Sequence, residues 1–280
     1  MIIWLASYPK SGNTWVRSIV SSLLYSDDGV FNFKLLQKID QFPEKKYFKD
    51  LINDFGNFDQ IKSNWILAQD KINLDGKQKL FKTHQGKYTL GRDKFINSSN
   101  TSGVIYIVRD PRTVVSSISN HYTLSIKESL KFMLSPSLIG NSLSFEEKKD
   151  GLLTLLGKWN EHYRSWTRDK ENLLLIKYED LLLNPYLEIE KIVSFLKEYF
   201  QFETNEKKIE NILNSTSFKN LKNIENKDLF HEGVLNKEIN SKVNFFNLGP
   251  KNNWKTLLDK EIINSLQKNF AAEMKELNYL

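Results

Sequence analysis

The sequence of 280 residues has no cysteine, only six prolines and no apolar run long enough to cross a membrane. Without cysteine, the chain forms neither disulfides nor metal–thiolate sites. A predicted strand already begins at Ile2, which leaves no room for a cleavable signal peptide, so we expect a cytoplasmic protein. We find no internal repeat and no linker rich in Pro, Gly or Ser. A single domain over residues 1–280, large enough to bury a substantial core, is therefore expected.

Arginine is scarce as well, since it supplies only six of the 40 basic residues. The net charge of +6 is scattered among acidic residues, and no basic block is interleaved with aromatic residues as in a nucleic-acid-binding surface. We therefore expect no nucleic-acid partner and a solvated, lysine-rich surface. Such a surface is compatible with a local positive pocket for an anionic ligand.

The most informative stretch is Ser7-Tyr8-Pro9-Lys10-Ser11-Gly12-Asn13-Thr14-Trp15. It connects an apolar strand that starts at Ile2 to an amphipathic helix from about Thr14 to Leu24. The turn is thus a helix N-terminus, where amides without intrahelical partners and the positive end of the helix dipole favour a bound phosphate. Gly12 lets the backbone approach that ligand closely. The alternative is an ordinary strand, turn and helix with a chance lysine.

A second β-branched apolar run, residues 103–108, ends in Arg109-Asp110-Pro111-Arg112. Asp110 suits a helix N-cap and Pro111 the first helical position. Arg109 is therefore expected at the carboxyl end of a strand, facing a helix start, where open α/β sheets bind ligands. Pairing with a surface carboxylate is the alternative for Arg109. For Arg112 we expect a solvated position on the helix surface.

Both stretches resemble motifs of the cytosolic sulfotransferases, a family that uses 3′-phosphoadenosine-5′-phosphosulfate (PAPS) as sulfuryl donor. Residues 8–15 resemble the family's 5′-phosphosulfate loop, in which Thr stands in place of Asn13, and residues 109–117 resemble its 3′-phosphate motif. The resemblance implies an α/β, P-loop-like fold with a central parallel sheet and helices on both faces. It also implies that Arg109 and Ser117 hold the 3′-phosphate. The residues implied around the 5′-phosphosulfate are Lys10, Ser11, Gly12, Asn13, Thr14 and Trp15.

The triplet Lys82-Thr83-His84 follows a short predicted strand. A lone loop histidine is often structural, although the ordinary pKa of histidine suits a general base near neutral pH. The family carries its catalytic base in such a triplet. The resemblance therefore implies that His84 removes the proton of the acceptor. It also implies that Lys82 is a supporting lysine near the transferred group, and that Lys10 stabilises the departing 3′-phosphoadenosine 5′-phosphate (PAP). Because a sulfuryl group carries less negative charge than a phosphoryl group, we expect no metal.

Later segments complete the donor site that the resemblance implies. Tyr178, in Tyr-Glu-Asp-Leu after an apolar strand at residues 172–177, matches a family tyrosine that contacts the nucleotide. Thr216 matches a residue at the adenine edge, and Phe218 one across the adenine face from Trp15. A core position is the alternative for Phe218. The carboxylates of Glu179 and Asp180, which follow Tyr178, are interpreted as partners of the helix dipole.

The last matching segment, residues 245–255, departs from the family pattern Phe-x-Arg-Lys-Gly-x-x-Gly-Asp-Trp-Lys. Gly249 is kept, but Asn247 and Leu248 replace the Arg-Lys pair, which removes two expected charge contacts to the 3′-phosphate. We hypothesise that Lys251, on the turn after Gly249, supplies part of the lost charge.

Three segments near residues 26–76, 119–150 and 219–244 match the family poorly and are expected to carry acceptor-binding loops and lids. After the second of them we expect a helix that contains Leu152, Leu156 and Trp159. The acceptor is left open among a small alcohol or phenol, an amine, a sugar and a lipid headgroup, and the oligomeric state is open too.

Two other classes of function remain. A P-loop kinase would share the sheet and the helix-terminus cradle, but the Gly-Lys-Ser/Thr string of its loop is absent from the sequence. A non-catalytic nucleotide-binding protein would keep the loops and lose the base, and the presence of both Lys10 and His84 weighs against it.

Overall fold

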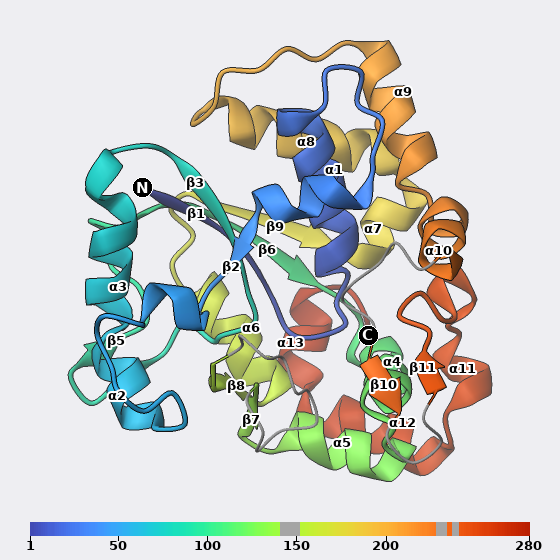
Figure 1. Cartoon of the computed structure of the whole chain (residues 1–280). Coiled ribbons are helices and arrows are strands. Elements are labelled where there is room, and N and C mark those ends of the chain that lie inside the picture. The colour runs from blue at the N-terminus through green and yellow to red at the C-terminus, as the bar shows by residue number, and fades with distance from the viewer. Residues whose placement is uncertain (141–151, 228–233, 237–240) are drawn as a thin grey trace.

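The computed structural model describes residues 1–140, 152–227, 234–236 and 241–280. Within these ranges its centre is a parallel five-stranded sheet with the strand order β2-β3-β1-β6-β9 (Figure 1). The predicted α/β fold with a central parallel sheet is thereby confirmed. The strands are β1 (Ile2–Ser7), β2 (Asp40–Gln41), β3 (Lys79–Thr83), β6 (Thr101–Val108) and β9 (Leu173–Lys177).

Helices cover both faces of the sheet, so β1 is buried along its whole length. Because side chains alternate along a strand, Ile3 and Leu5 of β1 point to one face, and Trp4 and Ala6 point to the other. The first face is covered by helices that Figure 1 places together at its top and right. They are α1 (Asn13–Tyr25), α7 (Tyr178–Leu183), α8 (Pro185–Lys197) and α9 (Glu206–Ser215).

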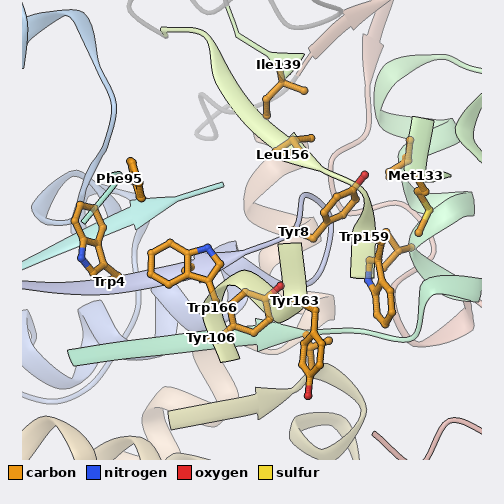
Figure 2. Packing of buried hydrophobic residues seen from close by; sticks show 14 of the residues in the cluster. Trp4, Tyr8, Phe95, Tyr106, Met133, Ile139, Leu156, Trp159, Tyr163 and Trp166 are labelled. Atoms are coloured by element: carbon orange, nitrogen blue, oxygen red, sulfur yellow. The ribbon is translucent and has the colours of Figure 1, made fainter. Parts of the chain in front are cut away.

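The second face carries the larger, aromatic-rich core. Trp4 packs against Phe95 and Trp166, with ring centroids 5.5 and 6.4 Å apart, and Figure 2 shows these rings beside Tyr106 of β6. Burial of such large side chains supplies most of the stabilisation on this face. Its helices are α2 (Phe58–Ser63), α3 (Trp65–Ile72), α4 (Pro111–Tyr122), α5 (Ile126–Leu134), α6 (Trp159–Thr167), α12 (Lys260–Asn269) and α13 (Ala271–Glu276).

Short elements fill the connections. Two further helices, α10 (Phe218–Asn226) and α11 (Trp254–Leu257), lie near the end of the chain. The remaining strands form three antiparallel pairs: β4 (Thr89–Leu90) with β5 (Asp93–Lys94), β7 (Ser137–Ile139) with β8 (Thr154–Gly157), and β10 (Val234–Asn236) with β11 (Ser241–Val243). The 3₁₀ turns are η1 (Phe33–Lys38), η2 (Lys45–Tyr47), η3 (Asn73–Asp75) and η4 (Gly249–Lys251).

The prediction of a helix that starts near Leu152 is wrong for the residues before Trp159. These residues include strand β8, and helix α6 begins only at Trp159. Gly157 ends the strand with a φ of 68°, a left-handed conformation that glycine adopts at little cost. The backbone N–H of Leu155 donates to Gln85 Oε1 at 2.7 Å, which pairs this strand with the loop after β3.

The expected solvated position of Arg112 is also wrong. Arg112 is buried, forms a 2.7 Å ion pair with Asp110, and lies over the Trp254 ring with its guanidinium carbon 3.9 Å from the centroid. It also donates to the carbonyl of Tyr279 at 2.6 Å. Asp110 is the N-cap of α4, as predicted, so its carboxylate lies where it can hold Arg112. The C-terminal residues then close over this pair.

Much of the segment near residues 26–76 packs on the core of the second face, through buried side chains such as Phe48 and Trp65. Phe31 and Leu36 of the same segment pack instead with Phe246, which lines the site described below. An acceptor-binding role for this segment stays a prediction. Parts of the other two expected acceptor segments, residues 141–151, 228–233 and 237–240, lie outside the described residues. None of the helices described has the length and apolar character needed to span a membrane.

Candidate active site

A cavity of about 380 Å³ lies where the carboxyl ends of β1, β3, β6 and β9 meet. Small-molecule sites commonly have this size, and open α/β sheets bind ligands at this edge. Among the described residues that line it, Lys10, Lys82 and Arg109 are cationic and none is Asp or Glu. The cavity is therefore suited to an anionic ligand.

The loop between β1 and α1 forms one wall of this cavity. Gly12 is the N-cap of α1 with a φ of 103°, and the first turn of α1 contains no acidic residue and no side-chain cap. A Cβ on Gly12 would lie 2.7 Å from Cδ2 of Tyr178, so the loop has no room for a side chain there. Neither an acidic side chain nor a side-chain cap therefore competes with an anion at this helix N-terminus.

Asn13 and Ser11 serve this loop in different ways. The Asn13 amide donates to the carbonyl of Leu5 at 3.0 Å and to Ser7 Oγ at 3.2 Å, so Asn13 ties the loop to β1 although it also lines the cavity. Ser11 does not line the cavity, but its hydroxyl is buried and has no hydrogen-bond partner among the described residues. A buried polar atom of this kind is normally satisfied by a ligand or water.

The three predicted catalytic residues, His84, Lys10 and Lys82, lie in the same cavity. His84 Nδ1 is 2.8 Å from the carbonyl oxygen of Ser7, which can only accept, so Nδ1 carries the proton. The lone pair of the neutral ring is then on Nε2, as a general base needs. Lys10 Nζ lies 3.6 Å from the ring centroid of Phe245, which covers it in this structure.

His162, which the sequence analysis did not assign to the site, supports His84 from behind. Its Nε2 lies 3.0 Å from the carbonyl oxygen of His84 and its Nδ1 lies 2.9 Å from the hydroxyl of Tyr106. Nε2 therefore donates to His84, and Tyr106 donates to Nδ1. Complete burial lowers the pKa of His162 to about 4, so the ring stays neutral at neutral pH.

This buried histidine predicts a pH dependence of folding. An unfolded histidine binds a proton near pH 6.5 and folded His162 only near pH 4, so the stability from His162 is present above about pH 6.5 and is lost as the pH falls toward 4. The loss amounts to roughly 3 kcal/mol, because each pKa unit corresponds to about 1.4 kcal/mol. We expect urea unfolding to show that the free energy of unfolding falls less between pH 7 and pH 4 in His162→Gln than in the wild-type protein, because glutamine does not titrate. An equal fall in both proteins would contradict this assignment.

Arg109 and Ser117 come together as the sequence predicted. An Arg109 Nη lies 3.4 Å from Ser117 Oγ and 3.3 Å from the carbonyl of Lys10. The guanidinium carbon is 4.0 Å from the ring centroid of Tyr178, which fixes the plane of the group. Arg109 Nε is buried and has no hydrogen-bond partner among the described residues, which leaves a donor for an anion.

Glu179 stabilises the turn that holds Arg109, a role in addition to the interaction with the helix dipole that was predicted for it. Its carboxylate accepts from the backbone N–H of Asp110 at 3.0 Å and from the hydroxyl of Tyr279 at 2.8 Å. Burial raises the pKa of Glu179. Tyr279, near the C-terminus, thus helps to position a turn that the sequence places about 170 residues earlier.

Aromatic residues line the remaining wall. Trp15, Tyr178 and Phe218 all border the cavity, and the rings of Trp15 and Tyr178 meet edge to face with centroids 5.5 Å apart. Phe218 is therefore not simply a core residue. Gly249 lies directly against it, since a Cβ on Gly249 would be 2.2 Å from the Phe218 ring. Planar rings at this wall provide stacking surfaces for a purine base.

Besides Ser11, two further predicted ligand contacts do not line the cavity. Thr216 is buried, and its hydroxyl donates to the carbonyl of Ile212 at 2.7 Å as the chain leaves α9. Its neighbours Asn214 and Ser217 line the cavity instead. Lys251 is exposed at the end of η4 and is not among the lining residues. This placement does not support the hypothesis that Lys251 replaces the lost Arg-Lys pair.

The structure also brings in residues that the sequence analysis did not predict, among them His121 and Asn252. His121 lies one helical turn after Ser117 on α4, a spacing that places both on one face and that could have indicated it. Asn252 stands where the family pattern has its second glycine. That departure was visible in the sequence, but the contacts of the side chain were not.

Comparison with known proteins agrees with these observations. The family model of the sulfotransferase domain matches residues 2–278. Amine sulfotransferase of Oryctolagus cuniculus is 24% identical over 283 residues, which cover 98% of this chain and 81% of that protein. Cytosolic sulfotransferase 7 of Arabidopsis thaliana is 27% identical over 234 residues, 80% of this chain and 64% of that protein. The chain thus matches less than two thirds of the length of the plant relative.

Solved structures support the fold. The mouse sulfotransferase SULT7A1 complexed with PAP has a TM-score of 0.58 at 18% identity, covering 98% of this chain and 83% of the other. Retinol dehydratase in a complex with retinol and PAP has a TM-score of 0.60 at 17% identity, covering 98% and 81%. The predicted resemblance is confirmed by the match of the family model over nearly the whole sequence: the chain belongs to the sulfotransferase domain family.

Proposed function

We propose that this protein transfers the sulfuryl group of PAPS to a hydroxyl or amine of a small-molecule acceptor. The observation that carries this proposal is a single cavity that collects Lys10, His84 and Arg109 and has no carboxylate among its described lining residues. Membership in the sulfotransferase domain family supports the same reaction.

The residues present fit the donor. The uncapped first turn of α1 and Lys10 suit the 5′-phosphosulfate, and Arg109 with Ser117 suits the 3′-phosphate. The buried and unsatisfied Nε of Arg109 favours an anion at that place. Trp15 and Phe218 offer rings to the adenine. PAPS, when bound, supplies an activated sulfuryl group.

In the proposed reaction His84 accepts the proton of the acceptor hydroxyl at Nε2, because its Nδ1 proton is held by the Ser7 carbonyl. Lys10 places positive charge where the leaving oxygen becomes negative. Both residues act on charge that develops in the transition state, which is where stabilisation increases the rate. His162 donates to the carbonyl of His84, and Tyr106 in turn holds His162.

For the acceptor we infer a small molecule with an apolar or aromatic body. Tyr122, Phe245 and Phe246 line the cavity in addition to the residues assigned to the donor. The names of relatives include a steroid, an amine and a luciferin as acceptors of those proteins. The cytoplasmic location and the absence of a metal requirement stay predictions.

The direct test is a screen for transfer of radiolabelled sulfate from PAPS to phenols, aliphatic alcohols, amines, sugars and lipid headgroups, with and without a metal chelator. We expect transfer to at least one class, insensitive to the chelator. Transfer of phosphate from ATP instead would favour a kinase, and binding of PAP without transfer to any class would favour a non-catalytic nucleotide-binding protein.

Thermal stability separates the two nucleotides before any acceptor is known. We expect PAP at a hundredfold excess over its dissociation constant to stabilise the fold by about 2.7 kcal/mol, because a ligand that binds only the folded state shifts the equilibrium by mass action. ATP, which lacks a 3′-phosphate for Arg109 and Ser117, should do much less. Equal melting shifts for PAP and ATP, or shifts that depend on magnesium, would contradict the proposed donor.

A further inference from the structure

The loop of residues 247–252 has lost the cations of the family pattern, yet it still borders the expected 3′-phosphate site. One side chain ties this loop to helix α4. The Asn252 amide nitrogen donates to the carbonyl of Thr113 at 2.9 Å and to Ser117 Oγ at 3.1 Å, and its oxygen accepts from Ser116 Oγ at 2.8 Å. Both protons and the oxygen of the carboxamide are thus engaged.

The contacts of Ser117 explain what this tie does. Ser117 Oγ lies 3.1 Å from the carbonyl of Thr113, 3.1 Å from the Asn252 amide and 3.4 Å from Arg109. A hydroxyl has one proton and two lone pairs, so Arg109 and Asn252 occupy the lone pairs and the proton points to Thr113 in this structure.

The carbonyl of Thr113 has two side-chain donors. The hydroxyl of Ser117 approaches it at 3.1 Å and the Asn252 amide at 2.9 Å. The hydroxyl of Ser116 also lies 3.1 Å away, but its single proton is donated to the Asn252 oxygen. A carbonyl oxygen has two lone pairs. Because Asn252 keeps this carbonyl satisfied, the Ser117 proton is able to turn to an anion without leaving an unsatisfied buried acceptor, which would otherwise carry a penalty.

We propose that Asn252 is a positioning residue for the 3′-phosphate of the donor. It orients the hydroxyl of Ser117 as a donor to that phosphate and holds the loop of residues 247–252 against α4. This role rests on the proposed function, since it presumes a donor nucleotide with a 3′-phosphate beside Arg109 and Ser117. By orienting a hydrogen-bond donor toward the 3′-phosphate, Asn252 offsets part of the binding that is lost with the Arg-Lys pair at positions 247 and 248.

The test compares binding of PAP and of adenosine 5′-phosphate, which lacks the 3′-phosphate, by calorimetry. Asn252→Ala should weaken PAP binding roughly 3- to 10-fold, the range expected for one neutral hydrogen bond, and should change adenosine 5′-phosphate binding less than twofold. Asn252→Asp, nearly the same shape but negatively charged, should weaken PAP binding roughly a further tenfold. The matched control Asn120→Ala alters another cavity residue, whose amide donates to Asn244, and should leave the ratio of the two affinities unchanged.

A double-mutant cycle with Ser117→Ala identifies the route of the effect. If Asn252 acts through Ser117, Asn252→Ala should cause little further loss of PAP affinity once Ser117 is alanine. Equal losses for both nucleotides, or losses that multiply in the double variant, would overturn the proposal and make Asn252 a general support of the loop. If the wild-type protein binds PAP no tighter than adenosine 5′-phosphate, the proposed function itself fails, and the role of Asn252 fails with it.

Discussion

Replacing His84 with alanine is expected to lower kcat for sulfuryl transfer by roughly 10²- to 10⁴-fold, the range for removal of a general base. The physical reason is the geometry of the ring. Because Nδ1 donates to the Ser7 carbonyl, Nε2 is the atom that accepts a proton, and no carboxylate among the described lining residues can take over this role. Binding of PAP should stay nearly unchanged, since the donor contacts are assigned to other residues.

The measurement is single-turnover transfer at saturating PAPS, with PAP binding followed separately by calorimetry. His121→Ala is the matched control, because it removes a second histidine that lines the same cavity and has no assigned chemical role. We expect its effect on kcat to be much smaller. Wild-type turnover in His84→Ala, or a larger loss in His121→Ala, would place the base elsewhere.

Replacing Lys10 with methionine is expected to lower kcat by roughly 10²- to 10³-fold, as found when one donor to a developing oxyanion is removed. In contrast to His84→Ala, this change should also weaken PAP binding by roughly 10- to 150-fold, because a charge-assisted contact contributes about 1.5–3 kcal/mol. Methionine keeps much of the length of the lysine side chain. The packing against Phe245 is thus largely retained while the charge is removed.

Steady-state kinetics and calorimetry on the same preparations separate the two effects. Lys268→Met, at an exposed lysine of α12, is the matched control and should leave both quantities unchanged. A Lys10→Met protein with unaltered PAP affinity and unaltered kcat would show that the loop does not bind the donor. A loss of kcat alone would mean that Lys10 acts only as charge develops.

Local signals in the sequence were sufficient for much of the architecture. The apolar runs predicted β1, β3, β6 and β9, and the N-cap Asp110 followed by Pro111 predicted the start of α4. These features depend on neighbours in the chain, so they are visible without the fold. The region before Trp159 was misjudged because leucines spaced four apart fit a helix, whereas pairing with β7 and the turn at Gly157 produce a strand.

Side-chain direction was decided by packing between distant segments. Arg112 was expected in solvent because the sequence does not reveal that Trp254 and Tyr279 close over it. Thr216 matched a family position and Lys251 was hypothesised to replace the missing Arg-Lys pair, but their side chains face an internal carbonyl and solvent, respectively. The role of His162 could not be predicted from the sequence. It depends on contacts with His84, which follows β3, and with Tyr106 of β6.

The amino-acid sequence was thus sufficient for the fold class, the family and the order of the motifs at the carboxyl edge of the sheet, because each motif joins a strand to the following turn or helix within a few residues. Which side chains reach the cavity, and how they are held, depends on packing between distant segments. The tautomer of His84 and the tie from Asn252 to Ser117 both come from hydrogen bonds between residues far apart in the chain. Such contacts exist only after the sheet has brought its loops together.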